Sequence, residues 1–167
     1  MAGEGAVSMK PGVRPCLSRR YAAILILLLT SCGQLPPTSS AVIPPIPAGA
    51  SRLWVYRNDG PYDSQDRPYL RLNDQIAAIS EPNGAFYRDL PPGHYTISVD
   101  SYGVPFPNQF AALDLAAGQT VFVKVLSMRE RVGGGEYVSL RALFFTQPVP
   151  AEAAQAAIAS TPFYGNS

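Results

Sequence analysis

Short runs in which apolar and polar residues alternate fill most of the sequence between residues 51 and 147. In residues 94–100, for example, Tyr95, Ile97 and Val99 are separated by single polar residues. A period of two places such apolar side chains on one face of a β-strand. Turn-forming Pro, Gly, Asn and Asp residues separate the runs, and no strong helical period lies between them. The pattern therefore predicts an all-β domain, an antiparallel β-sandwich of about seven to eight strands.

The individual strands can be placed from the alternation and from the turns that bound it. They are predicted at residues 52–57, 69–72, 76–79, 85–90, 94–100, 110–115, 119–126 and 136–146. Asn73-Asp74-Gln75 predicts a tight hairpin between the second and the third of them. The Ala-rich tail, residues 148–167, is predicted to hold a short helix over residues 152–159 and to end in a frayed segment from residue 161.

The first part of the chain carries a different pattern. A basic segment that ends in Arg19-Arg20 precedes the apolar run of residues 21–29. Crossing a membrane takes about 20 apolar residues, so this run is too short to span one. Basic residues before a short apolar run are typical of a secretory signal peptide, whether translation starts at Met1 or at Met9. The twin arginines also fit a Tat signal, an alternative that the strongly apolar run disfavours.

The end of this run is more specific. Leu29-Thr30-Ser31-Cys32 resembles the lipobox of bacterial lipoprotein precursors, in which the cysteine thiol takes a diacylglycerol and becomes the first mature residue. The resemblance implies a signal peptide of residues 1–31, cleavage between Ser31 and Cys32, and a membrane anchor of two or more lipid chains on Cys32. Because residue 33 is Gly rather than Asp, it also implies the outer membrane of a Gram-negative-type bacterium, facing the periplasm. The alternative is a buried apolar segment that happens to end in Ser-Cys.

Removal of residues 1–31 leaves a mature chain with little net charge. The leader takes four of the 13 basic residues and one of the 12 acidic residues, so 9 basic and 11 acidic residues remain. This balance leaves no basic patch, which argues against a nucleic-acid partner. The two cysteines, Cys16 and Cys32, both lie outside residues 51–147, so no disulfide is predicted there.

The stretch that begins at Cys32 changes the composition again. Residues 32–50 contain five prolines among Ser, Thr, Gly and Ala. Proline lacks a backbone donor and favours an extended, polyproline-like chain. We interpret residues 32–50 as the lipidated cysteine and a Pro-rich linker, with a reach of up to about 56 Å at 3.1 Å per residue. The alternative is a proline-capped edge strand that contains Val42 and Ile43.

Four motifs in the alternating part stand out together. They are Arg-Leu-Trp-Val-Tyr-Arg at 52–57, Gly-Ala-Phe-Tyr at 84–87, Pro-Gly-His-Tyr-Thr at 92–96 and Gly-Gln-Thr-Val-Phe-Val-Lys-Val at 118–125. In this order they resemble the DUF2846 family of bacterial lipoproteins and secreted proteins. The resemblance covers residues 51–146 and implies a transthyretin-like or carboxypeptidase-regulatory-like β-sandwich. It implies no catalytic residue. The chain departs from the family in Trp54 and in the Pro-rich insertion at residues 105–107.

Residue types that carry out catalysis or bind metals are sparse in the mature chain. His94 is the only histidine and has no cysteine beside it, so we expect a solvated position. Asp59, Asp63 and Asp66 could offer oxygen ligands to Ca²⁺, but their spacing lacks the EF-hand pattern and favours a polar loop. No Gly-x-Ser-x-Gly motif is present. The sequence thus predicts no enzyme, no metal site and no cofactor.

One aromatic segment is a candidate contact surface. Tyr102, Phe106 and Phe110 lie among prolines and glycines in residues 102–110. Exposed aromatic residues of this kind can form an interaction patch. The alternative is that Phe106 and Phe110 cover the open end of the sandwich.

Together these observations predict a lipid-anchored cell-envelope protein whose β-sandwich is a non-enzymatic binding or assembly module. Its expected partners are the membrane, through the lipid on Cys32, and an envelope protein of the periplasm. Two alternatives remain open. One is a structural or stress-related envelope lipoprotein without a discrete partner, and the other is an envelope hydrolase, which the single histidine disfavours.

Overall fold

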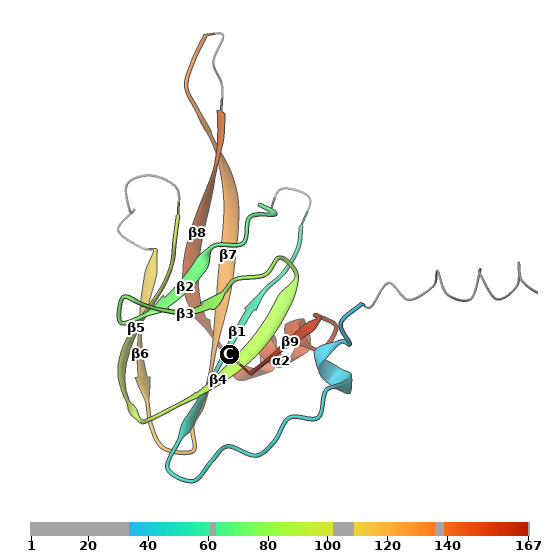
Figure 1. Cartoon of the computed structure of the whole chain (residues 1–167), viewed down its shortest axis with the longest axis vertical. Coiled ribbons are helices and arrows are strands. Elements are labelled where there is room, and N and C mark those ends of the chain that lie inside the picture. The colour runs from blue at the N-terminus through green and yellow to red at the C-terminus, as the bar shows by residue number, and fades with distance from the viewer. Residues whose placement is uncertain (1–33, 61–62, 102–108, 136–138, 167) are drawn as a thin grey trace, which may run out of the picture. The chain divides into compact units, whose positions relative to one another are not determined.

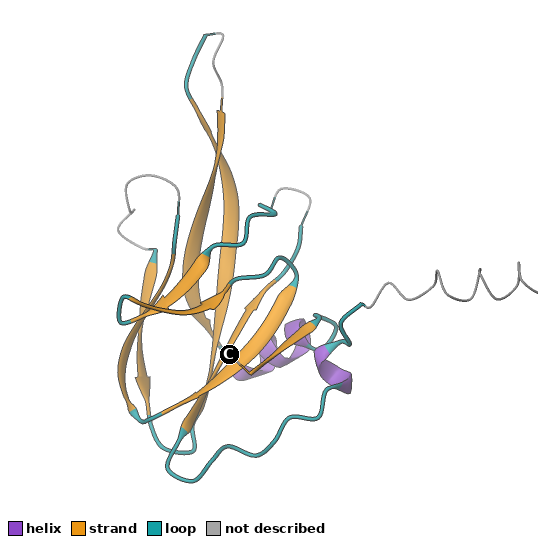
Figure 2. Ribbon diagram, viewed as in Figure 1, coloured by secondary structure: helices purple, strands orange, loops and turns teal. Residues whose placement is uncertain are grey.

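The computed structural model describes residues 34–60, 63–101, 109–135 and 139–166 (Figure 1). In chain order the elements are η1 (Thr38–Ser40), β1 (Ser51–Arg57), β2 (Tyr69–Leu72), β3 (Gln75–Ile79), β4 (Gly84–Leu90), β5 (Gly93–Val99), β6 (Phe110–Leu115), β7 (Thr120–Val132), β8 (Ser139–Val149), α2 (Ala151–Ile158) and β9 (Phe163–Asn166). They form a five-stranded sheet, β8-β7-β1-β4-β9, and a four-stranded sheet, β3-β2-β5-β6. The prediction of an all-β sandwich with a short helix near the C-terminus is confirmed (Figure 2).

The five-stranded sheet mixes strand directions. β1 pairs antiparallel with β4 but parallel with β7, and β9 pairs parallel with β4. Parallel neighbours need a long connection that returns the chain to the same end of the sheet, and β2 to β6 supply it between β1 and β7. The four-stranded sheet is antiparallel throughout, as predicted, whereas the antiparallel prediction is wrong for these two pairings of the five-stranded sheet. Alternation reports which face of a strand is buried, and it carries no information on strand direction.

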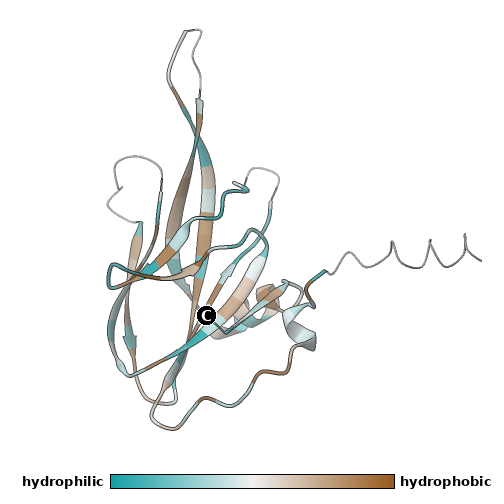
Figure 3. Ribbon diagram, viewed as in Figure 1, coloured by the Kyte–Doolittle hydropathy of each residue, from teal (hydrophilic) through white to brown (hydrophobic). Residues whose placement is uncertain are grey.

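The inner faces of the two sheets pack against each other as the main core. Leu53, Val55 and Ile97, which come from the predicted alternating sets, are at most 1% exposed. The buried residues of this core are Leu53, Val55, Leu70, Leu72, Phe86, Leu90, Ile97, Val99, Ala111, Leu113, Leu115, Val123, Val125, Ala142 and Phe144. Figure 3 shows the apolar residues spaced along the strands. Their removal from water is the main favourable term of folding.

The outer face of the five-stranded sheet carries a second, smaller core. The rings of Trp54 and Tyr87 lie there with centroids 5.2 Å apart, and Phe163 of β9 stacks on Tyr87 at 6.0 Å. Ala154 and Ile158 of α2 pack into the same cluster. As a result, every residue of β1 is buried. The five-stranded sheet is thus the middle layer, with the second sheet on one face and α2 on the other.

The Pro-rich segment before β1 is held by backbone hydrogen bonds to the C-terminal segment. The Thr38 N–H donates to the carbonyl of Thr161 over 2.8 Å. The Phe163 N–H donates to the carbonyl of Pro36 over 2.9 Å. In Figure 1 the first part of this segment, in blue and cyan with η1, lies next to α2, and the rest runs below the domain to the start of β1.

These contacts show that residues 34–50 are not a free linker, whereas Cys32 and Gly33 lie outside the described residues. The compact unit begins at Gln34, and Ile43 packs against the outer core. The alternative of an edge strand is not observed either, since Val42 is 95% exposed and no strand forms there. Three backbone hydrogen bonds join residues 36–39 to residues more than 100 positions away, and the composition of the segment cannot reveal such bonds.

The C-terminal segment folds onto the sheet. α2 lies one residue earlier than the predicted helix, and β9 then pairs with β4, so that Phe163 is opposite Ala85. The prediction of a frayed end from residue 161 is wrong, because β4 offers this segment a free edge of backbone N–H and C=O groups. β8 also runs past its predicted end and contains Pro148, which is tolerated because β8 is an edge strand.

The β2–β3 and β7–β8 hairpins differ in how well they were predicted. Asn73 and Asp74 have φ angles of 48° and 63°, the left-handed pair that a two-residue type I′ turn requires, so the tight β2–β3 hairpin is confirmed. β7 instead continues beyond its predicted end at residue 126, and its pairing with β8 reaches Val132 opposite Ser139. The outer part of β7 carries mostly exposed polar side chains, so it lacks the alternation that marks a half-buried strand.

Candidate functional site

Four residues that the sequence singled out lie outside the residues that the structure describes. This holds for Ser31 and the predicted lipidation residue Cys32, and for Tyr102 and Phe106 of the predicted patch. The third patch residue, Phe110, begins β6 and is 57% exposed, so it does not cover the core. The lipid anchor and the aromatic patch therefore stay predictions.

The single histidine lies at the surface, as expected. The His94 side chain is 92% exposed and pairs with Asp114, which is 81% exposed. This pair joins the neighbouring strands β5 and β6. Within the described ranges, no three His, Cys, Asp or Glu side chains come together in a group that could hold a metal ion.

The loop after β1 surrounds a buried arginine at the end of that strand. Arg57 is 1% exposed, and its Nη1 donates to the carbonyl of Asp66 over 2.8 Å. Nη1 and Nη2 also donate to the carbonyls of Ser80 and Ser64, respectively. Burial lowers the pKa of Arg57, and nearby carboxylates, above all that of Asp63, oppose this change. The arginine therefore fixes the loop from inside.

The acidic residues of this loop have partners within the protein. Gln65 Nε2 donates to Asp59 Oδ1 over 2.9 Å, and Ser127 Oγ donates to Asp63 Oδ1 over 2.9 Å. The backbone carbonyl of Asp66 accepts from the buried arginine described above. These contacts agree with the polar-loop interpretation of the three aspartates.

An apolar groove of about 440 Å³ opens at one edge of the sandwich, where β3 and β9 are the last strands of their sheets. Its lining residues are Tyr69, Ile76, Ala77, Ala78, Ile79, Glu81, Phe86 and Tyr164. Ile76 is 56% exposed and Ile79 is 43% exposed. Glu81 is the only charged residue of the lining, and its carboxylate pairs with Arg67. Apolar side chains grouped in such a hollow are the usual mark of a binding site.

The wall formed by β3 is irregular. The register between β2 and β3 shifts between Leu70 and Arg71, which leaves Ala77 without an opposite residue in β2. Arg88 of β4 reaches across and donates from Nη1 to the Ala77 carbonyl over 2.6 Å. A bulge and an occupied carbonyl hinder the addition of another long strand at this edge. The groove thus offers side-chain contacts more than backbone pairing.

On the side of the groove opposite β3, the position of Tyr164 depends on Gly84. A Cβ at Gly84 would lie 2.9 Å from Cε2 of Tyr164 and 2.8 Å from the Cβ of Glu81. The absence of a side chain therefore lets the Tyr164 ring lie close to β4. A tyrosine in this position presents an apolar ring with a hydroxyl that can still form hydrogen bonds.

The other edge of the sandwich is closed by polar contacts between the sheets. Thr146 Oγ1 of β8 lies 3.0 Å from the carbonyl oxygen of Ile97 and 3.2 Å from that of Gln109. The Phe144 N–H donates to Ser101 Oγ over 2.9 Å. One edge is therefore joined across the sheets, whereas the β3–β9 edge carries the groove.

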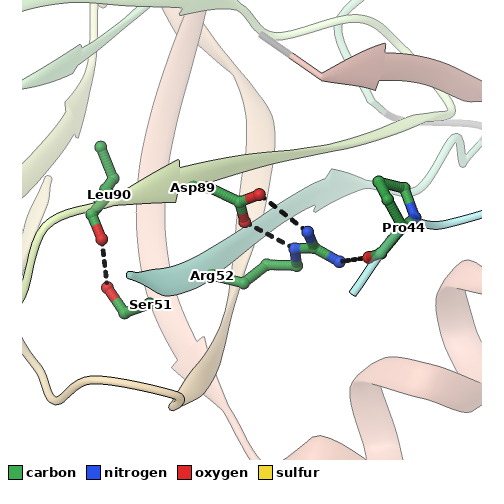
Figure 4. A network of polar contacts seen from close by, with 5 residues as sticks. All are labelled: Pro44, Ser51, Arg52, Asp89 and Leu90. Atoms are coloured by element: carbon green, nitrogen blue, oxygen red, sulfur yellow. Dashed lines mark hydrogen bonds and ion pairs between the residues drawn. The ribbon is translucent and has the colours of Figure 1, made fainter. Parts of the chain in front are cut away.

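A polar network fixes the end of the Pro-rich segment beside β1 and β4 (Figure 4). Arg52 donates from Nε and Nη2 to both carboxylate oxygens of Asp89, over 2.7 and 2.8 Å, and from Nη1 to the carbonyl of Pro44 over 2.7 Å. Its guanidinium carbon lies 4.1 Å from the centroid of the Tyr87 ring. The hydrogen bonds to Asp89 raise the pKa of Arg52. All of these groups are engaged with one another, so the network is structural.

No family model, curated protein or solved structure matches the chain. The resemblance to the DUF2846 family therefore stays a prediction, and the site has to be argued from its geometry. None of the described helices is long and apolar enough to cross a membrane.

Sequence reasoning missed the groove. Residues 76–79, Ile-Ala-Ala-Ile, were interpreted as an ordinary short strand. The available signal was the broken alternation of this run, because two apolar ends around two alanines do not fit a period of two. That break corresponds to the bulge at Ala77.

Proposed function

We propose that this protein is a lipid-anchored component of a bacterial cell envelope whose β-sandwich binds an apolar segment of another envelope protein in the groove beside β3. The anchor rests on the lipobox-like residues that end in Cys32. The binding role rests on the groove, where Ile76, Ile79 and Tyr164 present apolar surface at an edge of the fold. This exposed apolar surface is the observation that carries the proposal.

The chemistry of the groove favours an uncharged, extended segment as its ligand. Isoleucine and alanine side chains line it together with Tyr69 and Tyr164, whose side chains combine an apolar ring with a hydroxyl group. Because Arg88 occupies the carbonyl of Ala77, strand pairing with β3 would be limited to a short stretch. The lining contains no histidine, cysteine or serine, so the proposal is one of binding and not of catalysis.

Site-specific photocrosslinking in intact envelopes tests the binding role. A benzoylphenylalanine at position 76 lies in the groove, whereas the same residue at position 140 replaces Leu140, which is 62% exposed on β8. We expect a discrete crosslinked product from position 76 and none from position 140. Ile79→Asp should abolish this product without changing the circular dichroism spectrum.

Three results would count against this role. Equal products from both positions, or a product that Ile79→Asp leaves intact, would contradict binding in the groove. The absence of any product would favour the structural or stress-related lipoprotein without a discrete partner.

The anchor is tested separately by metabolic labelling with a clickable palmitate analogue. The full precursor should take up label, and Cys32→Ser should remove it, because the thiol is the acceptor of the lipid. Label that persists in Cys32→Ser would refute the lipobox interpretation.

A further inference from the structure

The two ends of the domain lie against each other beside the five-stranded sheet. α2 and Ile43 pack on the outer face of this sheet, and β9 forms its edge next to β4. The Ser39 N–H donates to the carbonyl of Ala159 over 3.0 Å, and Thr38 donates from both its N–H and its Oγ1 to the carbonyl of Thr161 over 2.8 Å. Together with the bond between Phe163 and Pro36, these contacts fix the first described residues to the segment after α2. We call residues 34–50 together with residues 150–166 the terminal layer.

The terminal layer is nearly free of charge. Residues 34–50 contain no charged residue, and Glu152 is the only one in residues 150–166. All other charged residues of the mature chain lie in residues 51–149. The layer also exposes apolar side chains, with Val42 at 95% and Leu35 at 43%. Such a surface can approach lipid at little desolvation cost, whereas a charged surface cannot.

The covalent chain limits how far this layer can move from an anchor at Cys32. The first fixed backbone group is that of Pro36, four residues after the cysteine. A fully extended chain spans at most about 3.6 Å per residue, so this distance is at most about 14 Å in any conformation. The Pro-rich composition had predicted about 56 Å, a value that assumed free movement up to residue 50.

We propose that the terminal layer is the membrane-facing surface of the domain and lies against the lipid bilayer that holds Cys32. This inference rests on the lipid anchor of the proposed function. The short chain brings the layer to the bilayer, and its single charged residue keeps the desolvation cost of contact with the bilayer low. Because β9 belongs to the layer and also lines the groove through Tyr164, the groove opens close to the membrane.

Fluorescence quenching on vesicles tests this orientation with the mature, lipidated protein. The lipid occupies the thiol of Cys32, and the mature chain has no other cysteine, so Val42→Cys and Leu140→Cys each provide a single labelling position. Both positions are exposed, and Leu140 lies outside the terminal layer, on the β7–β8 hairpin. Phosphatidylcholine vesicles with spin-labelled headgroups should quench a fluorophore at position 42 several-fold more strongly than one at position 140.

The outcomes separate this inference from the proposed function. Flotation with the vesicles reports the anchor, and Cys32→Ser should stay in solution. If the lipidated protein floats but positions 42 and 140 are quenched equally, or position 140 more, the orientation is refuted while the anchor stands. If the protein that carries Cys32 does not float, the anchor fails and the orientation fails with it.

Discussion

The two faces of the five-stranded sheet are buried by different kinds of sequence. The inner face meets the four-stranded sheet, and both partners come from strands with clear alternation. The outer face meets α2 and the Pro-rich segment, which come from the least patterned parts of the mature chain. This difference shows that terminal segments without a clear apolar pattern, here α2 and the Pro-rich segment, can form part of a hydrophobic core. Without them, Trp54 and Tyr87 would lose the cover that keeps their rings out of water.

The largest expected effect comes from removing the aromatic centre of the outer face. Trp54→Ala should lower the free energy of unfolding by about 3–5 kcal/mol, and Leu53→Ala on the inner face by about 2–5 kcal/mol. Similar losses are expected because both side chains are almost fully buried. Urea denaturation followed by circular dichroism measures both variants. A loss below about 1 kcal/mol for Trp54→Ala alone would mean that the outer face is not a packed core.

Removal of the first part of the terminal layer should have the next largest effect. A protein that begins at Ile43 lacks Pro36, Thr38 and Ser39, and therefore loses their backbone hydrogen bonds to the segment of residues 159–163. At about 1 kcal/mol for each hydrogen bond, it should be about 2–4 kcal/mol less stable than a protein that begins at Gln34. Thermal unfolding of the two proteins compares them directly. Equal stabilities would restore the linker interpretation of these residues.

The smallest expected effect concerns how the free energy of unfolding depends on pH in the alkaline range. Burial on the outer face raises the pKa of Tyr56 above its usual value near 10, so the folded state keeps this proton longer than the unfolded state does. Stability should therefore be unaffected by this group below about pH 10 and should fall as the pH rises above it. Tyr56→Phe removes this contribution, so its unfolding free energy should fall less steeply in that range. An unchanged slope would indicate that the hydroxyl is solvated.

The prediction of the fold succeeded where residue types themselves indicate the structure. Leu53, Val55 and Ile97 were placed inside because alternation reports burial directly. The Asn73-Asp74 turn was found because those residue types tolerate a positive φ. The parallel pairing of β1 with β7 was missed, because the residue pattern of a strand does not indicate how the strand runs relative to its neighbour.

The candidate site and the terminal layer were harder to predict for a related reason. Within the terminal layer, main-chain bonds hold residues 36–39 to residues 159–163, and the residue types do not indicate such bonds. The groove exists because β3 and β9 end their sheets side by side, which only the tertiary structure reveals. The residues that the sequence favoured for contact were instead aromatic ones, of which only Phe110 lies in the described part.

The central claim is that the Pro-rich segment is an integral part of the domain, which keeps any anchor at Cys32 close to the terminal layer. Backbone hydrogen exchange at Thr38, Ser39 and Phe163, followed by NMR, tests it most directly. We predict that these three amides exchange far more slowly than those of an unstructured peptide, with protection that approaches that of β1. Exchange at the rate of an unstructured peptide, while β1 stays protected, would contradict the claim.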